Sequence, residues 1–310
     1  MKIIFLGTPE ISACCLKRLI NSNHEILAVV TKPDKPVGRG NKMQETPVKQ
    51  VAKEANLPIL EFNSVSKEGV SILKNLKPDA LVLVAFGQIL SKEVLDIALP
   101  VNLHGSLLPD LRGPSPIQSA ILNGYKKSGV SVMVMAEEVD SGDIILQEEI
   151  NIDEADTSGS LFEKMGDVGA EVLVKALDLI ESKKAVFLPQ DHTKATFTQM
   201  LTKQNAKLDF NKTTAEIINK IKAYNPAPVA YFEYDEKKYK VFKAGVYEGI
   251  MPRKMFKNGE VVFANSKLGF VIKTQDGFLS LEEIQAPNGK VLKVKDFLNG
   301  AKFPEGVLLN

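Results

Sequence analysis

The stretch KIIFLGTPEISACCLKRLINSNHEILAVV, residues 2–30, decides the fold class of the chain. Residues 2–6 form a short apolar run typical of a strand, and GTP at 7–9 is a turn whose proline suits the first turn of a helix. Residues 10–21 place apolar side chains near helical spacing, and residues 25–30 are a second apolar run. A strand, a helix and a strand in this order predict a βαβ unit with parallel strands.

The same alternation of strands and helices continues to about residue 181. Most of the apolar runs are rich in Val, Ile and Leu without strict alternation, which is typical of strands buried on both faces. The sequence therefore predicts an α/β domain over residues 1–186 with a Rossmann-like, doubly wound parallel sheet. Further strands are expected at 59–62, 80–84, 101–104, 130–135 and 144–150, and further helices at 47–55, 67–76, 92–97, 116–122 and 157–181.

The texture of the sequence changes in its last third. Residues 187–206 are polar and rich in Thr, and they are expected to be a linker. A helix is expected at 214–223, ending before NPAP at 225–228, whose prolines cannot continue it. Short alternating runs with Gly and Asn turns then predict a small, OB-like β barrel over residues 207–310. Its strands are expected at 229–234, 239–244, 260–263, 269–274 and 278–285.

The composition excludes several classes of protein. The 310 residues are 44% hydrophobic and 25% charged, so a sizeable core is expected, and no apolar run approaches the ~20 residues that span a bilayer. The only cysteines, Cys14 and Cys15, are neighbours that rarely form a disulfide with each other, which fits a reducing compartment. The three histidines are far apart in the sequence. We therefore expect a cytoplasmic protein that interacts with no membrane and holds no metal.

The net charge of +1 conceals an asymmetry. Residues 206–310 carry 17 Lys and Arg against 12 Asp and Glu, giving +5, while the rest of the chain totals −4. A basic C-terminal third indicates either a polyanionic partner or ordinary surface variation, and the charge alone does not decide between them.

A nicotinamide-binding site is not predicted. Gly7 follows the first strand, where a dinucleotide-binding fold places its glycines, but Pro9 and Ser12 occupy the next two glycine positions of G-x-G-x-x-G. The glycines that would cradle the phosphates are therefore missing. Gly7 is better explained as a tight turn close to a bound ligand.

The stretch VNLHGSLLP, residues 101–109, carries the strongest chemical signal. Asn102 and His104 point to the same face of the expected strand and lie at its carboxyl end, where open α/β sheets bind ligands. An amide beside an imidazole can stabilise a developing oxyanion and move a proton. A structural histidine with satisfied hydrogen bonds is the alternative for His104 taken alone.

Two later segments complete this pattern. RGPSPIQ at 112–118 predicts a rigid loop, and VDSGDI at 139–144 is a turn between two expected strands that presents Asp140. The three segments together resemble the folate-dependent formyltransferases, which use 10-formyltetrahydrofolate. Asn102, His104 and Asp140 match the catalytic trio of that family residue by residue, and SLLP at 106–109 matches its S-L-L-P motif.

The resemblance covers essentially the whole chain and implies roles for particular residues. Asn102 and His104 would polarise the formyl oxygen, and Asp140 would orient His104 and help to remove the proton of the attacking amine. The co-substrate would be 10-formyltetrahydrofolate, with no metal. The folate would contact two segments, although a buried strand end remains an alternative for the first of them. These residues are Phe86, Gly87, Gln88, Ile89, Leu90, Ser106, Leu107, Leu108 and Pro109.

Four features narrow the resemblance to the members that formylate initiator methionyl-tRNA for translation initiation. They are FLGTP at 5–9, the basic segment 31–49, RG with PIQ within 112–118, and KLD at 207–209 with NPAP at 225–228 before a basic C-terminal domain. The segment 32–49 carries a charge of +3, which suits phosphate contact, although a solvated loop is the alternative. The chain is expected to act as a monomer. Contacts with tRNA are expected from Lys32, Lys35, Arg39, Lys42 and Lys207.

Three other functions stay open at this point. The same chemistry could act on the amine of a sugar nucleotide, which the basic C-terminal domain disfavours. A non-catalytic RNA-binding protein is disfavoured by the intact trio, and a folate hydrolase would release free formate.

Overall fold

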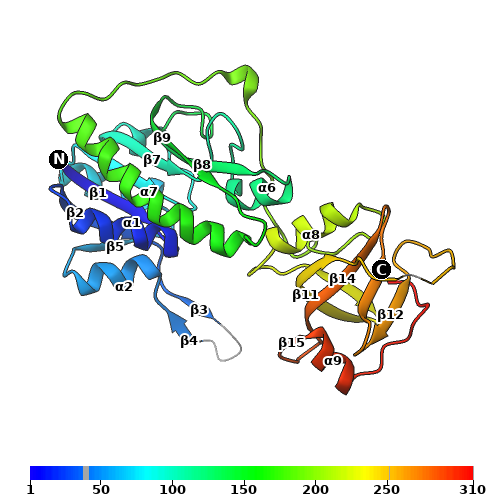
Figure 1. Cartoon of the computed structure of the whole chain (residues 1–310). Helices are drawn as coiled ribbons and strands as arrows, with labels where there is room; N and C mark the ends of the chain where they lie inside the picture. Colours follow the sequence, from blue (N-terminus) through cyan, green and yellow to red (C-terminus); the bar gives the residue numbers. More distant parts are fainter. Residues whose placement is uncertain (38–41, 251, 310) are drawn as a thin grey trace. The chain divides into compact units, whose positions relative to one another are not determined.

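The computed structural model describes residues 1–37, 42–250 and 252–309. The chain divides into two compact units (Figure 1). The first unit holds residues 1–116, 127–151 and 162–198, and the second holds residues 117–126, 152–161 and 199–310. The domain limits expected from the sequence, 1–186 and 207–310 with a linker at 187–206, stay a prediction.

The first unit is built on a seven-stranded sheet with the order β5-β2-β1-β6-β7-β8-β9. The five strands from β5 to β7 are parallel, as the βαβ pattern predicts, and they are β1 (Lys2–Gly7), β2 (Glu25–Thr31), β5 (Ile59–Glu61), β6 (Ala80–Val84) and β7 (Leu99–His104). The doubly wound α/β class is confirmed.

The remaining edge of this sheet differs from the expected parallel pattern. There β8 (Lys127–Val134) pairs antiparallel with β7, and β9 (Ile144–Asn151) pairs antiparallel with β8. For β8 and β9 the reason lies in their connection, because residues 135–143 hold no helix and a parallel crossover needs a dozen or more residues.

The helices follow the expected positions with local differences. The expected helix at 67–76 is two helices, α3 (Val65–Glu68) and α4 (Val70–Asn75), which meet at Gly69. The segment at 31–49 holds a short hairpin, β3 (Lys35–Val37) and β4 (Lys42–Gln44), that the sequence pattern did not predict. The other helices of the first unit are α1 (Glu10–Ile20), α2 (Pro47–Glu54), α5 (Lys92–Leu95) and most of α7 (Ser158–Glu181), together with the 3-10 helix η1 (His192–Lys194).

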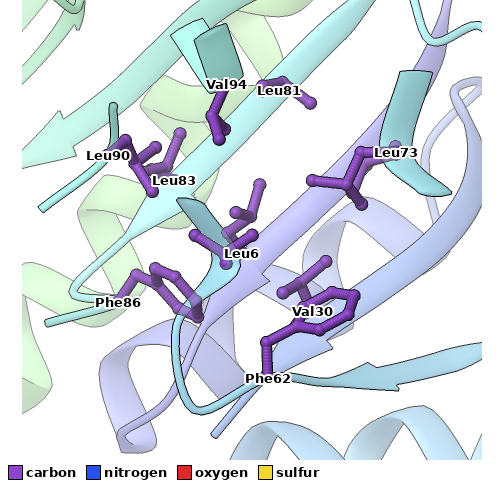
Figure 2. Close-up of a cluster of buried hydrophobic side chains, with 11 residues drawn as sticks. Leu6, Val30, Phe62, Leu73, Leu81, Leu83, Phe86, Leu90 and Val94 are labelled. Carbon is purple, nitrogen blue, oxygen red and sulfur yellow. The ribbon is translucent and has the colours of Figure 1, made fainter. Parts of the chain in front are cut away.

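A buried apolar cluster on one face of the sheet fixes its centre (Figure 2). Leu6 of β1, Val30 of β2 and Leu81 of β6 are fully buried and meet Leu73 of α4 and Val94 of α5. Fully burying one such side chain contributes about 1.5–3 kcal/mol. The central strands are therefore held in place by packed side chains on this face.

The second unit is an antiparallel sheet with the order β10-β11-β14-β13-β12, and β15 pairs with β14. This curled sheet confirms the predicted small barrel. Phe232 is fully buried and lies within about 6 Å of Tyr239, Phe270 and Phe303, so these aromatic rings form a core. The elements are α6 (Pro116–Leu122), whose first residue belongs to the first unit, α8 (Thr214–Ala223), β10 (Tyr231–Tyr234), β11 (Lys237–Val246), β12 (Val261–Asn265), β13 (Gly269–Lys273), β14 (Phe278–Gln285), β15 (Val291–Lys293) and α9 (Val294–Gly300).

Across the described part of the chain, no helix combines the length and the apolar character that crossing a membrane requires.

Candidate active site

The site is built at the carboxyl end of β7, between β6 and β8. Asn102 pairs in register with Leu83 and Met133, and His104 pairs with Ser131. The two side chains share one face of the strand because they are two residues apart. The Asn102 amide is half-buried and makes no hydrogen bond with the residues that the structure describes, so it is available to a ligand.

The His104 ring is held on both sides. Its Nε2 atom lies 3.0 Å from the Leu111 carbonyl oxygen, which can only accept, so Nε2 carries the hydrogen. Its Nδ1 atom faces Asp140 Oδ2 at 3.5 Å, and the ring is only 7% exposed. The structure therefore brings His104 and Asp140 together although 36 positions separate them in the sequence.

Asp140 lies in a tight turn between β8 and β9. The Gly113 backbone amide donates to Asp140 Oδ2 over 2.8 Å, and Asp140 has a left-handed backbone with φ of 52°. Gly142 is required in this turn because a Cβ there would lie 1.9 Å from the Val134 carbonyl oxygen. Gly142 is therefore required by the geometry of the turn that presents Asp140.

Hydrogen bonds hold the S-L-L-P segment, residues 106–109, against the edge of the sheet. Ser106 Oγ donates to the Asp110 carbonyl over 2.5 Å, and Ser131 Oγ donates to the Ser106 carbonyl. Gln147 Nε2 donates to the Leu108 carbonyl over 3.0 Å, and the Leu108 side chain is buried. Ser106 and Leu108 therefore shape the loop, whereas Leu107 and Pro109 are half-buried.

The segment 86–90 divides between core and surface. Phe86 and Leu90 belong to the buried cluster of the sheet (Figure 2). Gln88 accepts from the Val65 amide and donates to the Phe62 carbonyl, so it braces the loop. Ile89 is 93% exposed. A ligand at this edge would meet the backbone of this loop and the Ile89 side chain.

The residues predicted to bind tRNA differ in their surroundings. Lys32 Nζ donates to the Gly87 carbonyl over 2.9 Å, and burial together with nearby Lys35 lowers the pKa of Lys32. Lys207 pairs with Glu233 at 2.8 Å, while Lys35 is exposed. Arg39 lies outside the described residues, as does the side chain of Lys42.

The structure adds Gln190 and the side chain of Arg112 to the site. Gln190 Nε2 donates to the Asp140 and Gly142 carbonyls, and Arg112 donates to Gln190 Oε1. Both side chains are buried. The sequence reasoning missed Gln190 because it lies in a polar, Thr-rich stretch that is typical of a linker.

A cation site is a separate question. Within the described residues, His24, Asp178 and Glu181 form the one group of His, Cys, Asp and Glu side chains with donor atoms close enough to share an ion. His24 precedes β2 and Glu181 ends α7, so this group lies away from the carboxyl end of β7. The trio itself is an amide, an imidazole and a carboxylate, which suits acyl transfer.

Comparisons with known proteins agree with this chemistry. The formyl transferase family matches residues 1–177, and the C-terminal domain of formyl transferases matches residues 200–302. The methionyl-tRNA formyltransferase of Clostridioides difficile (strain 630) is 42% identical over 312 residues, with 100% of both chains covered. The chain therefore belongs to the formyl transferase family, within its methionyl-tRNA formyltransferase branch.

Solved structures support the fold. HypX from Aquifex aeolicus in complex with tetrahydrofolic acid has a TM-score of 0.67 at 19% identity; the match covers 96% of this chain and 47% of HypX, so this chain spans about half the length of HypX. The methionyl-tRNA formyltransferase from Clostridium thermocellum has a TM-score of 0.58 at 17% identity, covering 81% of this chain and 95% of that one.

The Asp140 turn gives a first prediction. Gly142→Ala should lower the free energy of unfolding by about 1–3 kcal/mol or more, because the added methyl group collides with the Val134 carbonyl. Gly166→Ala is the control: its methyl group would lie at ordinary contact distances in α7, and removing a helical glycine should stabilise by about 0.4–1 kcal/mol. Urea unfolding followed by circular dichroism measures both. Equal stability of the two variants would contradict the crowding at Gly142.

Proposed function

We propose that this chain transfers the formyl group of 10-formyltetrahydrofolate to the amino group of methionyl-tRNA. The products are formylmethionyl-tRNA, used in translation initiation, and tetrahydrofolate. The observation that carries the proposal is the meeting of Asn102, His104 and Asp140 in a chain that is 42% identical to a methionyl-tRNA formyltransferase over its whole length. Since translation initiation uses the product, we place the reaction in the cytoplasm.

The mechanism follows from the positions of the three side chains. The neutral amine attacks the formyl carbon, and the new C–N bond yields a tetrahedral oxyanion. The Asn102 amide and the Nε2 hydrogen of His104 donate to this oxygen, which takes the place of the Leu111 carbonyl as partner of Nε2. Collapse of the intermediate breaks the bond between the formyl carbon and N10 of the folate, and N10 takes up the proton that the amine gave to Asp140.

Asp140 handles the proton that the attacking amine loses. Its carboxylate is 14% exposed, and Oδ2 already accepts from the Gly113 amide and faces His104. Oδ1 remains for the amine or for a bridging water. One proton-transfer group of this kind contributes about 10²–10⁴ to the rate.

The folate is assigned to the carboxyl edge of the sheet beside the trio. The backbone of Gly87, Gln88 and Ile89 offers amides and carbonyls there, and Leu107 with Pro109 offers half-buried apolar surface. The other four residues expected at the folate site are buried and support this surface from within the protein. They are Phe86, Leu90, Ser106 and Leu108. This division accounts for all nine residues expected at the folate site.

The tRNA is assigned to the basic parts of the chain. Residues 206–310 carry +5, and the segment 32–49 carries +3. Lys35 and Lys42 belong to β3 and β4, and Arg39 lies between them in the sequence, outside the described residues. Lys32 and Lys207 hold protein partners, so they would exchange these for phosphate on binding. Phosphate contacts make the affinity fall as salt rises.

His104→Ala and Asn102→Ala should each lower the rate of formyl transfer to methionyl-tRNA, by about 10²–10⁴ for His104 and ~10²–10³ for Asn102. Asn75→Ala is the control, because Asn75 is an exposed residue of α4. Single-turnover transfer from 10-formyltetrahydrofolate measures the rate, with thermal unfolding to show that the variants fold. Formate release without transfer would establish a hydrolase, and transfer only to an amino-sugar nucleotide would establish that rival substrate.

Arg39→Ala and Lys35→Ala should weaken binding of initiator methionyl-tRNA and reduce the salt dependence, by a slope of about 1 for each lost phosphate contact. Lys175→Ala, an exposed lysine of α7, is the matched control. Filter binding at salt concentrations from roughly 50 to 200 mM measures how steeply the logarithm of the binding constant falls with the logarithm of the salt concentration. If the slopes of Arg39→Ala and Lys35→Ala equal that of Lys175→Ala, these two residues do not contact the tRNA.

We propose that the chain acts as a monomer. The support is that one chain supplies all three members of the trio, so the site needs no second copy. Sedimentation equilibrium should give the chain mass of 34.0 kDa. Twice that mass at the protein concentrations of the assay would overturn the proposal.

A further inference from the structure

We infer that Gln190 is a positioning residue for the reaction, acting through Asp140. It touches neither substrate in the proposed mechanism. It holds the turn from which Asp140 reaches His104, and buried Arg112 holds Gln190 in turn. This inference rests on the proposed formyl transfer, and it adds a residue that neither the motif nor the family match assigns.

Every polar atom of the Gln190 amide is engaged. Nε2 donates to the Asp140 carbonyl over 2.9 Å and to the Gly142 carbonyl over 2.7 Å. Oε1 accepts from Arg112 Nε over 3.1 Å and from Arg112 Nη2 over 2.7 Å. Because a guanidinium only donates and a carbonyl only accepts, the amide has one possible orientation. The side chain is 6% exposed, so water does not replace these bonds cheaply.

Arg112 closes the arrangement into a ring of hydrogen bonds. Its side chain is 3% exposed and finds its acceptors in Gln190 and in His192 Nδ1, 3.1 Å away. The residues on either side of it bind the trio directly, since Leu111 accepts from His104 and Gly113 donates to Asp140. Asp140 is therefore tied to residues 111–113 twice, through its carboxylate and, by way of Gln190, through its main chain.

Gln190 is itself fixed on both sides. Before it, Leu188 exchanges two backbone hydrogen bonds of 2.9 Å with Ile144. After it, Thr196 accepts from the Arg112 amide over 2.9 Å, and the Thr198 amide donates to the Arg112 carbonyl over 2.8 Å. We name residues 188–198 the belt. The belt places Gln190 independently of Asp140, which allows Gln190 to impose a conformation on the turn.

The turn holds Asp140 in a strained backbone conformation, and the hydrogen bonds from the belt stabilise it. A non-glycine residue with a left-handed backbone, as at Asp140, is strained and persists where its surroundings fix it. Without the donor of Gln190, two carbonyls lose their partner and the turn can relax. Displacing a reacting group by about 1 Å costs on the order of 10²-fold in rate.

Gln190→Glu is the sharpest test, because it replaces only the amide NH2 group by an oxygen. It therefore separates the donor that binds the turn from the acceptor that binds Arg112. The carboxylate keeps the acceptor for Arg112 and adds an ion pair, so the belt stays folded. It replaces the donor by an oxygen that repels the Asp140 and Gly142 carbonyls. Gln190→Met removes both halves without adding charge. Asn75→Asp makes the same amide-to-acid change at an exposed site and serves as control.

We expect Gln190→Glu to lower kcat by ~10–100-fold, with KM for 10-formyltetrahydrofolate and for methionyl-tRNA within ~2-fold of the wild type. Its thermal midpoint should match that of the wild type, and Gln190→Met should lose activity to a similar extent. Unchanged kcat in Gln190→Glu would overturn the inference. So would a loss that appears in KM or in the thermal midpoint alone, because that pattern indicates a merely structural role. Absence of transfer by the wild type would instead overturn the proposed function.

Discussion

The hydrogen bond from the Gly113 amide to the Asp140 carboxylate is the interaction on which the site depends. It joins two loops that leave different strands, one after β7 and one between β8 and β9. Without it, His104 would keep its place on a strand paired on both sides, and Asp140 would be free to turn away. The proposed formyl transfer needs both groups within reach of one formyl carbon.

The three members of the trio are therefore held by different means. Asn102 and His104 take their positions from β7, whose neighbour β6 contributes to a buried apolar cluster. Asp140 lies outside the sheet and takes its position from hydrogen bonds to loops. Rigid strands position side chains well, and a loop reaches comparable order only when its polar groups are all engaged. The belt supplies that order.

The sequence was sufficient to predict the features of the fold and site that depend on local residue patterns. Strand and helix periodicity predicted the parallel sheet and the barrel, and a spacing of two residues placed Asn102 and His104 on one face. It could not predict that β8 and β9 run antiparallel, because that depends on which strands become neighbours. The belt looked like a linker for the same reason: the contacts of Gln190 lie about 50 and 78 positions away, as in its bonds to Asp140 and Arg112.

Much of the geometry around Asp140 is built from the main chain. The Leu111 carbonyl, the Gly113 amide and the Asp140 and Gly142 carbonyls are groups that almost every residue type would offer. Descendants of this gene can therefore exchange most side chains of these loops and inherit the same reactive arrangement. Drift is restricted at the few positions where a side chain, or the lack of one, is itself the contact. A family can in this way diverge widely in sequence while its chemistry stays constant.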